Sequence, residues 1–412
     1  MHPLLIINLA LGGLFALFYA YQFVYLFISY LKKKKLSPSG KLLRYAILVA
    51  ARNEDTVIKD LLCSLNKLNY PKELYTVFVV ADNCTDLTAD AARSQGATVY
   101  ERFSVSERGK GYALNFLMNN IHKDFGKDAF DAFTVFDADN IVDPEFLTEM
   151  NKALTSGYDA AASYRASKNY GASWVSAGQG MCFLREMVSL NRARMAVGGC
   201  AFISGTGYAF TRELAERFGG GWPFHTLTED GEFTAYNATS GNKVGYVDSA
   251  IFYDDQPRSF RQSWRQRLRW CRGGMQVFKL YIGKLIRGIF SRRFTACFDL
   301  CMCMAPAYFI TTAAVAANAV GLTASLIMKD NIAPILLMLA LELAAIYLAL
   351  LFFSITLTVS EWRRIDCSGG KKILYAFTFP FFMLTFAPVA IVALFVRSNT
   401  WHPIVHTPSE HT

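Results

Sequence analysis

The chain has 412 residues, 53% of them hydrophobic, and a formal net charge of +9. The apolar residues gather toward the two ends, whereas residues 36–293 have the composition of a globular protein. The sequence therefore describes a membrane protein with one large soluble insert rather than a string of soluble domains. Much of the positive charge flanks the apolar segments, which argues against nucleic-acid binding. No GxGxxG, P-loop, HExxH or GxSxG motif occurs, which disfavours dinucleotide, P-loop, zinc-protease and hydrolase functions.

Four apolar segments, 4–31, 296–328, 332–360 and 373–397, are long enough to cross a bilayer, for which about 20 residues suffice. Lysines at 32–35 follow the first segment, and arginine or lysine pairs flank the others. The positive-inside rule then predicts a multi-pass protein of the cell membrane with a cytosolic insert and both termini outside. The nine cysteines are expected to be reduced thiols, because the insert faces the cytosol.

These patterns divide the chain into an N-terminal span (1–35), a cytosolic domain (36–258), interface helices (259–293), three C-terminal spans (294–400) and a short tail (401–412). In the cytosolic domain, short apolar runs alternate with helical patterns, which is typical of an α/β fold with a mainly parallel sheet. We expect strands at 45–51, 75–81, 97–102 and 132–138, and helices at 55–66, 85–95 and 110–122. Asp143 and Pro144 are expected to open a further helix.

Polar clusters follow three of these strands: RNED after the first, DNCTD after the second and DADN after the fourth. In open α/β sheets, ligands bind outside the carboxyl ends of the strands. The three clusters together therefore predict a binding site at that edge of the sheet.

Asp137 and Asp139 stand two residues apart at the end of the fourth strand. Alternate residues of an extended chain point the same way, so both carboxylates should face one site. Such a pair suits Mg²⁺ or Mn²⁺ bound together with phosphate oxygens. A lone pair of this kind is more often an Asp-rich turn, but the other two clusters favour a metal site.

Two further stretches offer charged groups to the same site. Lys110, in a glycine-flanked turn that enters a helix, would make an anion site with the helix-start amides, although a solvated loop is an equal alternative. Glu229 and Asp230 precede another helix, where they could act chemically or simply cap it. His225 beside them is expected to be a packed loop histidine.

The stretch from Trp264 to Ile289 carries an apolar stripe with helical spacing, flanked by lysine and arginine. This pattern predicts a helix that lies in the membrane interface with its stripe on lipid, with a kink possible at Gly273 and Gly274. At about 100° per residue, Trp270 falls on the face opposite the stripe, so it should point toward the cytosolic domain.

In this order, the motifs AARNE, VVADNCTD, GKGYAL, FDADN, SGTG, TED and QRLRW resemble those of the membrane-embedded family 2 glycosyltransferases. Within that family, the chain is most similar to the cellulose, chitin, hyaluronan and poly-N-acetylglucosamine synthases. The resemblance covers about residues 43–275 and the arrangement of apolar segments. It implies a GT-A fold with a Rossmann-like sheet, and inverting transfer of a sugar from a nucleotide sugar, usually a UDP-sugar.

The resemblance also implies roles for individual residues. On the donor side, Asp137 and Asp139 would hold the metal, and the nucleotide and its diphosphate would contact Ala51, Arg52, Glu54, Asp82, Lys110, Asp137, Gln266 and Arg269. Asp230 would be the general base on the acceptor hydroxyl. On the acceptor side, the sugar would stack on Trp270 and be bordered by Ser204, Gly205, Thr206 and Glu229.

The function implied is a processive synthase that extends a β-linked glycan from UDP-glucose or UDP-N-acetylglucosamine and feeds it through the membrane. The alternative is a non-processive enzyme that adds one or a few sugars to a lipid. A non-enzymatic scaffold or transporter is disfavoured by the intact acidic motifs. Four spans are few for one chain to form a glycan channel by itself, so a homo-oligomer or an accessory subunit is expected if a polysaccharide is exported.

Overall fold

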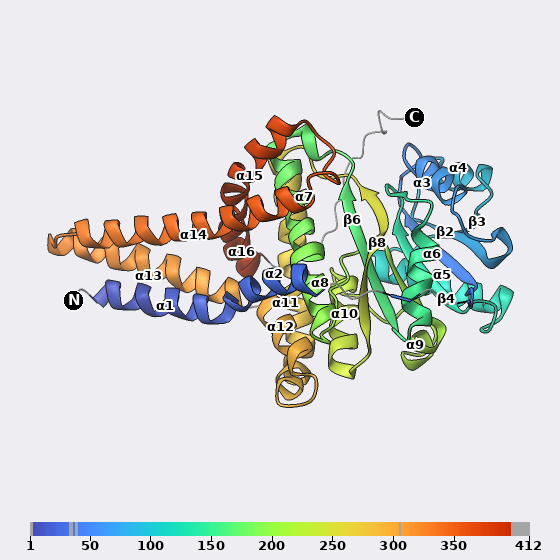
Figure 1. The fold of residues 1–412 in the computed structure, drawn as a ribbon, viewed down its shortest axis with the longest axis horizontal. Helices are drawn as coiled ribbons and strands as arrows, with labels where there is room; N and C mark the ends of the chain where they lie inside the picture. Colours follow the sequence, from blue (N-terminus) through green and yellow to red (C-terminus); the bar gives the residue numbers. More distant parts are fainter. Residues whose placement is uncertain (1–2, 33–35, 38–39, 305, 397–412) are drawn as a thin grey trace.

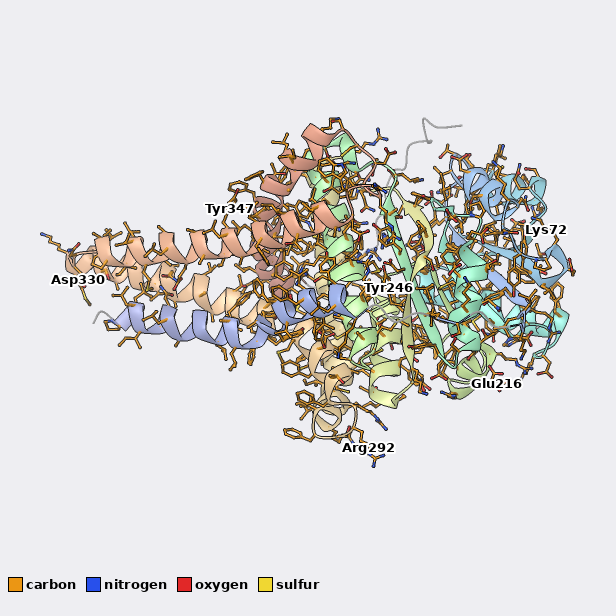
Figure 2. All side chains as sticks on the ribbon, in the orientation of Figure 1. Lys72, Glu216, Tyr246, Arg292, Asp330 and Tyr347 are labelled. Carbon is orange, nitrogen blue, oxygen red and sulfur yellow. The ribbon has the colours of Figure 1, made fainter. Side chains whose placement is uncertain are left out.

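The computed structural model describes residues 3–32, 36–37, 40–304 and 306–396 (Figure 1). A sheet with its covering helices forms one end of the molecule, and a bundle of long helices projects from the other (Figure 1). Asp330 marks the tip of that bundle, and Lys72 lies at the opposite end of the molecule (Figure 2). The predicted lysines at 33–35 and the predicted tail at 401–412 lie outside the described residues.

Within these residues, eight strands form one sheet in the order β3-β2-β1-β4-β7-β6-β8-β5. The strands are β1 (Tyr45–Ala51), β2 (Tyr75–Asp82), β3 (Thr98–Arg102), β4 (Ala132–Asp137), β5 (Ile141–Val142), β6 (Ala160–Ser167), β7 (Tyr208–Thr211) and β8 (Val244–Asp254). The pairs β3–β2, β2–β1, β1–β4 and β6–β8 are parallel, whereas β7 and β5 pair antiparallel with their neighbours. The prediction of a mainly parallel sheet and of its first four strands is confirmed.

Helices cover both faces of the sheet, because alternate residues of its strands point into two separate cores. In β1, Ala46 and Leu48 face one core, and Ile47 and Val49 face the other. The first core is closed by α5 (Lys110–Phe125), α9 (Arg212–Arg217) and α10 (Glu229–Ser240). The second is closed by α3 (Ile58–Leu65), α4 (Thr88–Ser94) and α6 (Phe146–Thr155).

Three of these helices begin later than the sequence predicted. Before α3 and α4, Asn53 and Asn83 adopt left-handed backbone conformations (φ 56° and 54°), so the polar clusters form turns instead of a first helical turn. Before α6, the Asp143 carboxylate accepts a hydrogen bond from the Glu145 amide (2.9 Å) in a turn, and the helix starts at Phe146.

The described residues contain four helical segments long and apolar enough to cross a membrane: Pro3–Leu31, Phe294–Met328, Ala333–Ser360 and Gly369–Phe395. The helices concerned are α1 (Pro3–Tyr19), α2 (Tyr21–Leu31), α12 (Phe294–Met304), α13 (Pro306–Met328), α14 (Ala333–Ser360), α15 (Gly369–Leu384) and α16 (Phe386–Phe395). Within the described residues, the projecting bundle consists of α1, α13 and α14, and α1 packs against both of the others (Figure 1). The last segment breaks at Thr385, and its two halves pack at the base of the bundle. The number of bilayer crossings and the side of each terminus stay predictions.

A continuous helix, α11 (Phe260–Ile289), joins the sheet domain to these helices, with no break at Gly273 or Gly274. Its apolar stripe does not face lipid, so that prediction is wrong. Trp264, Leu268, Cys271 and Met275 pack with Val389 and Ala393 of α16 and with Tyr308 of α13. The apolar residues do lie along one face of the helix, as their spacing predicted, but other helices of the same chain cover that face.

A buried ion-pair cluster fastens α12 to the sheet domain. α7 (Trp174–Leu184) continues through a π-helical segment (Arg185–Asn191) into α8 (Arg192–Ala196). Arg194 of α8 is 2% exposed and donates hydrogen bonds to Asp299 of α12 and to Glu186 of the π-helical segment. Tyr21 of α2 donates to the same Asp299 (2.6 Å). All nine cysteines, including Cys303 beside this cluster, are free, as predicted.

Replacing Asp299 by alanine should lower the free energy of unfolding by about 3 kcal/mol, because Arg194 would keep its charge in a buried site with one carboxylate fewer. Thermal unfolding of the detergent-solubilised protein measures this change. The control is Asp90→Ala, since Asp90 pairs with Arg93 on the exposed surface and its loss should change little. Equal midpoints for both variants would contradict the fastening role of Asp299.

Candidate functional site

One cavity of about 920 Å³ runs from the carboxyl ends of β1, β2 and β4 to α11 and the helices at the base of the bundle. Nearly every residue to which the sequence analysis assigned a role lines this cavity. The predicted residues that line it are Ala51, Arg52, Glu54, Asp82, Lys110, Asp137, Asp139, Ser204, Gly205, Glu229, Asp230, Gln266, Arg269 and Trp270. The exception is Thr206.

At the outer end of the cavity, hydrogen bonds hold the turns after β1 and β2 together. Asn53 accepts a hydrogen bond from the Thr85 amide (2.8 Å). Asp82 at the end of β2 is paired with the buried Arg102 of β3 (2.7 Å), which the sequence analysis did not identify. This pair fixes the Asp82 carboxylate at the rim of the cavity.

Asp137 and Asp139 stand at the end of β4, as predicted, and Asp139 is only 8% exposed. Lys110, the first residue of α5, donates to the Asp137 carboxylate and to the Gly205 carbonyl (2.7 Å). Burial lowers the pKa of Lys110, but the carboxylates of Asp137, Glu229 and Asp230 outweigh it, and the net pKa is raised. Lys110 therefore stays charged among the acidic groups.

Within the described residues, no three His, Cys, Asp or Glu side chains come together as a ready-made metal cage. Asp137 and Asp139 offer two carboxylates only. That donor set fits a cation that takes its remaining ligands from phosphate and water, as Mg²⁺ usually does.

Thr206 lies behind the cavity wall and is 3% exposed. Its hydroxyl accepts a hydrogen bond from the Asp137 amide (2.9 Å) and donates to Asn140. The sequence assigned Thr206 to the acceptor, but in the structure it supports the backbone of the carboxylate pair. Gly205, one residue earlier, does face the cavity, with φ of 83° and its carbonyl bonded to Lys110.

Glu229 and Asp230 occupy the first turn of α10, and Thr228 stands at the N-cap. A Cβ added to Gly205 would lie 3.6 Å from Asp230 Oδ2, so the SGTG loop and this carboxylate are neighbours. Burial raises the pKa of both carboxyls, although Lys110 and Arg269 oppose the rise. A carboxylate with a raised pKa, facing a cavity, is suited to accept a proton.

The QxxRW residues of α11 form the wall of the cavity toward the apolar helices. Arg269 donates to the Leu227 carbonyl (3.3 Å), which ties α11 to the loop before Asp230. The Trp270 ring meets Phe183 of α7 edge-to-face, with centroids 5.8 Å apart. Trp270 thus lines the same cavity as the paired aspartates and does not face lipid, as the sequence predicted.

The sequence analysis missed a second ion pair in the cavity wall. Arg165 of β6 donates to Asp254 of β8 (2.9 Å) and to the Ser204 carbonyl (2.8 Å), and its guanidinium lies 3.6 Å from the Phe183 ring centre. Asp254 belongs to a polar cluster, DDQ, that follows β8 just as the other clusters follow β1, β2 and β4. That signal could have identified Asp254, whereas a lone arginine inside an apolar strand gives none.

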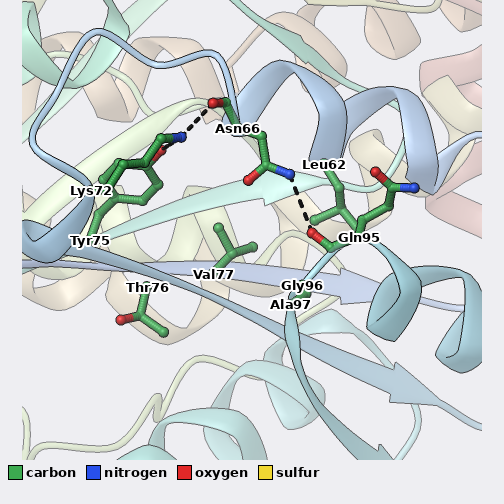
Figure 3. Close-up of a pocket in the computed structure, with 9 residues that line it drawn as sticks. All are labelled: Leu62, Asn66, Lys72, Tyr75, Thr76, Val77, Gln95, Gly96 and Ala97. Atoms are coloured by element: carbon green, nitrogen blue, oxygen red, sulfur yellow. Dashed lines mark hydrogen bonds between the residues drawn. The ribbon is translucent and has the colours of Figure 1, made fainter.

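Two other features lie apart from this cavity. His225 stacks on Tyr112, with centroids 4.2 Å apart, but it is an exposed residue and so is not packed in the loop as expected. A small hollow of about 180 Å³ lies at the start of β2, at the opposite end of the strand from Asp82 (Figure 3). Lys72 in that hollow already donates to the Asn66 carbonyl and to the Tyr75 hydroxyl.

The glycosyltransferase like family 2 model matches residues 43–273, more than half of the chain. The chain belongs to this family. Its similar relatives include the probable glycosyltransferase YdaM of Bacillus subtilis, 26% identical over 260 residues (59% of this chain, 58% of the relative). The beta-monoglucosyldiacylglycerol synthase of Nostoc is 28% identical over 283 residues (67% and 58%). The poly-beta-1,6-N-acetyl-D-glucosamine synthase of Staphylococcus aureus is 25% identical over 263 residues (62% and 59%).

The aligned part of this chain spans just under three fifths of the length of these curated relatives. Among solved structures, the mannosyltransferase PcManGT from Pyrobaculum calidifontis, in complex with GDP-Man and Mn²⁺, is similar with a TM-score of 0.63 and 18% identity. The likeness covers 94% of this chain and 99% of that one, so it includes the apolar helices as well as the sheet. Family membership and this shared fold confirm the predicted GT-A architecture.

Replacing Gly273 by alanine should slow sugar transfer by about tenfold or more. The added Cβ would lie 2.5 Å from the Thr228 side chain, so Thr228 would have to shift. A shift of Thr228 would move Asp230, which follows it by two residues. Gly283→Ala is the matched control, because nothing lies within 4 Å of its added Cβ. Initial rates on the two purified variants test this expectation, and equal rates would contradict it.

Proposed function

We propose that the protein transfers a hexose, glucose or N-acetylglucosamine, from a UDP-sugar to a hydroxyl acceptor at the membrane, with inversion at the anomeric carbon. The observation that supports this most directly is the single cavity, which joins the carboxylate pair, Asp230 and Trp270. Membership of the family supports the reaction class, and the resemblance of the motifs supports UDP as the carrier.

Asp230 is the base in this proposal. It accepts the proton of the acceptor hydroxyl while the hydroxyl oxygen attacks the anomeric carbon and the bond from that carbon to the diphosphate oxygen breaks. The raised pKa of Asp230 makes it a better proton acceptor than an exposed aspartate. General-base catalysis of this kind contributes about 10²–10⁴ in rate. Lys110 and Arg269 lie on the cavity wall where they can bind the departing diphosphate.

Asp137 and Asp139 are the residues that would hold a divalent cation, with Asp139 the more buried of the two. When bound, Mg²⁺ or Mn²⁺ would offset negative charge on the diphosphate. The presence of Mn²⁺ in the PcManGT complex supports a divalent cation for this fold.

A lipid is the acceptor class that the cavity lining favours. Beyond Trp270, the lining combines the charged Arg185 and Glu186 with apolar or sulfur-containing side chains of α7, α11 and the helices at the base of the bundle: Cys182, Cys271, Met304, Tyr308, Met383 and Phe386. The apolar side chains in this wall would pack against acyl or isoprenoid chains, whereas the hydroxyls of a passing glycan would lose hydrogen bonds to water beside them. The similarity to beta-monoglucosyldiacylglycerol synthase points the same way.

Processive extension of a β-glycan, coupled to its translocation, is the second candidate. It is supported by the QxxRW motif and by the similarity to poly-beta-1,6-N-acetyl-D-glucosamine synthase. Because only α1, α13 and α14 form the described projecting bundle, glycan export would require a second copy or an accessory subunit.

Sizing the product separates the two candidates. Membranes that contain the protein are incubated with Mg²⁺ or Mn²⁺ and labelled UDP-glucose or UDP-N-acetylglucosamine, and the product is partitioned between solvent and water. We expect a short, solvent-soluble glycolipid. A long water-soluble glycan would instead support the processive synthase. If the protein releases sugar from neither donor, that result contradicts the proposed function.

Replacing Asp230 by asparagine should reduce the transfer rate by about 10²–10⁴ while UDP still binds, because the change removes the base and keeps the shape of the side chain. Steady-state rates and UDP titration of the purified protein measure the two effects. Asp90→Asn, at an exposed position on α4, is the control and should keep the wild-type rate. A fully active Asp230→Asn variant would remove the base assignment.

A further inference from the structure

The wall beside Trp270 is built from two neighbouring helices, α7 and α11. Ser263 of α11 donates a hydrogen bond to Gln179 Oε1 of α7 (3.4 Å), and Trp270 of α11 meets Phe183 of α7 at 5.8 Å. Gln179 lies one turn before Phe183, and Gln266 lies one turn before Trp270. The two glutamines therefore stand on facing helices at the same end of the aromatic pair.

Each of these glutamines carries a buried polar atom without a partner among the described residues. The Gln179 side chain is 0% exposed and its Nε2 donates to nothing, while Gln266 Oε1 accepts from nothing. Both residues line the cavity. Leaving such groups unpaired in a buried site is costly, so bound water or a ligand is expected to complete their hydrogen bonding.

The two unpaired atoms are complementary, because one is a donor and the other an acceptor. A hydroxyl group can accept from an amide N–H and donate to an amide oxygen at the same time. A phosphate oxygen could pair with Gln179 Nε2 but not with Gln266 Oε1. The Gln266 Nε2 can still donate to the diphosphate that the motif resemblance assigns to this residue, while its Oε1 accepts from a hydroxyl.

We propose that Gln179 and Gln266 form a hydroxyl-binding pair that positions the acceptor against Trp270. This inference rests on the proposed function and adds to it a residue of α7 outside the recognised motifs. The ligand chemistry is an alcohol, which a lipid headgroup or the terminal sugar of a glycan can supply.

A purely structural role for Gln179 makes a different prediction. If Gln179 only holds Ser263, then removing the serine hydroxyl should have the same effect as removing the amide. If Gln179 binds the acceptor, only the loss of the amide should matter. Gln179→Met, which keeps the length of the side chain, and Ser263→Ala separate the two roles.

The experiment uses the full chain in phosphatidylcholine vesicles with UDP-glucose and UDP-N-acetylglucosamine as donors. Dioleoylglycerol is the lipid probe in one arm and octyl β-glucoside is the sugar probe in the other. Gln179→Met should raise the acceptor KM by about tenfold to a hundredfold. The affinity for UDP should stay unchanged, and Ser263→Ala should resemble the wild type.

A double variant adds a second test, because two residues that bind one hydroxyl are not independent. The acceptor KM of Gln179→Met combined with Gln266→Met should rise by less than the product of the single effects. If Gln179→Met unfolds, Gln179→Asn, which draws the amide back by one methylene, should raise the acceptor KM in the same direction.

Three results would overturn the inference: an unchanged acceptor KM in Gln179→Met, an equal change in Ser263→Ala, or multiplicative effects in the double variant. The arm in which the wild type is active identifies the source of the hydroxyl. A wild type that neither transfers nor hydrolyses any donor would contradict the proposed function itself, which is a separate outcome.

Discussion

The structure depends on one buried cation, Arg267 of α11. Its side chain is 0% exposed, and the described residues place no carboxylate beside it. Arg267 donates to the Thr385 hydroxyl (2.6 Å) at the break between α15 and α16. The guanidinium also lies 4.6 Å and 4.7 Å from the ring centres of Phe382 and Phe386. A cation is favoured there by the rings and by the carboxyl end of α15, although burial lowers the pKa of Arg267.

Arg267 follows Gln266 directly and precedes Arg269 by two residues on the same helix. Because the Arg267 side chain is held at Thr385, the rotation of α11 about its own axis is set, and with it the direction of Gln266 and Arg269. The apolar stripe of α11 is then held against α16, and the opposite face must point into the cavity. Phe382 is itself pressed against α7, where a Cβ on Gly178 would lie 2.3 Å from its ring. One guanidinium therefore links the apolar helices, the cavity wall beside Trp270 and the QxxRW residues.

The sequence predicted the sheet and its polar edge well. Parallel strands are buried on both faces and so appear as apolar runs, and the polar residues that follow them form the turns and the ligand site at the edge of the sheet. It did not predict what covers the stripe of α11, since apolar spacing is the same whether lipid or α16 lies against it. Thr206 was misplaced for a related reason: motif resemblance puts the SGTG loop at the site but does not say which side chain faces inward. Arg165 and Gln179 were missed because single polar residues in apolar elements become meaningful only when their neighbours are known.

In the proposed function, the position of the cavity between the sheet and the apolar helices would satisfy two conflicting electrostatic needs. A bound diphosphate would need cations and access to solvent, for which the cavity offers Arg52 at its outer end and Lys110 beside the carboxylates. A carboxylate that acts as a base requires a dry environment to raise its pKa, and the buried first turn of α10 provides that. A site wholly at the sheet edge would leave Asp230 too well hydrated, and one within the bundle could not admit the donor. Placing α11 across the base of the bundle would satisfy both, because its cavity-facing side closes the inner end of the cavity and leaves the outer end for the donor of the proposed reaction.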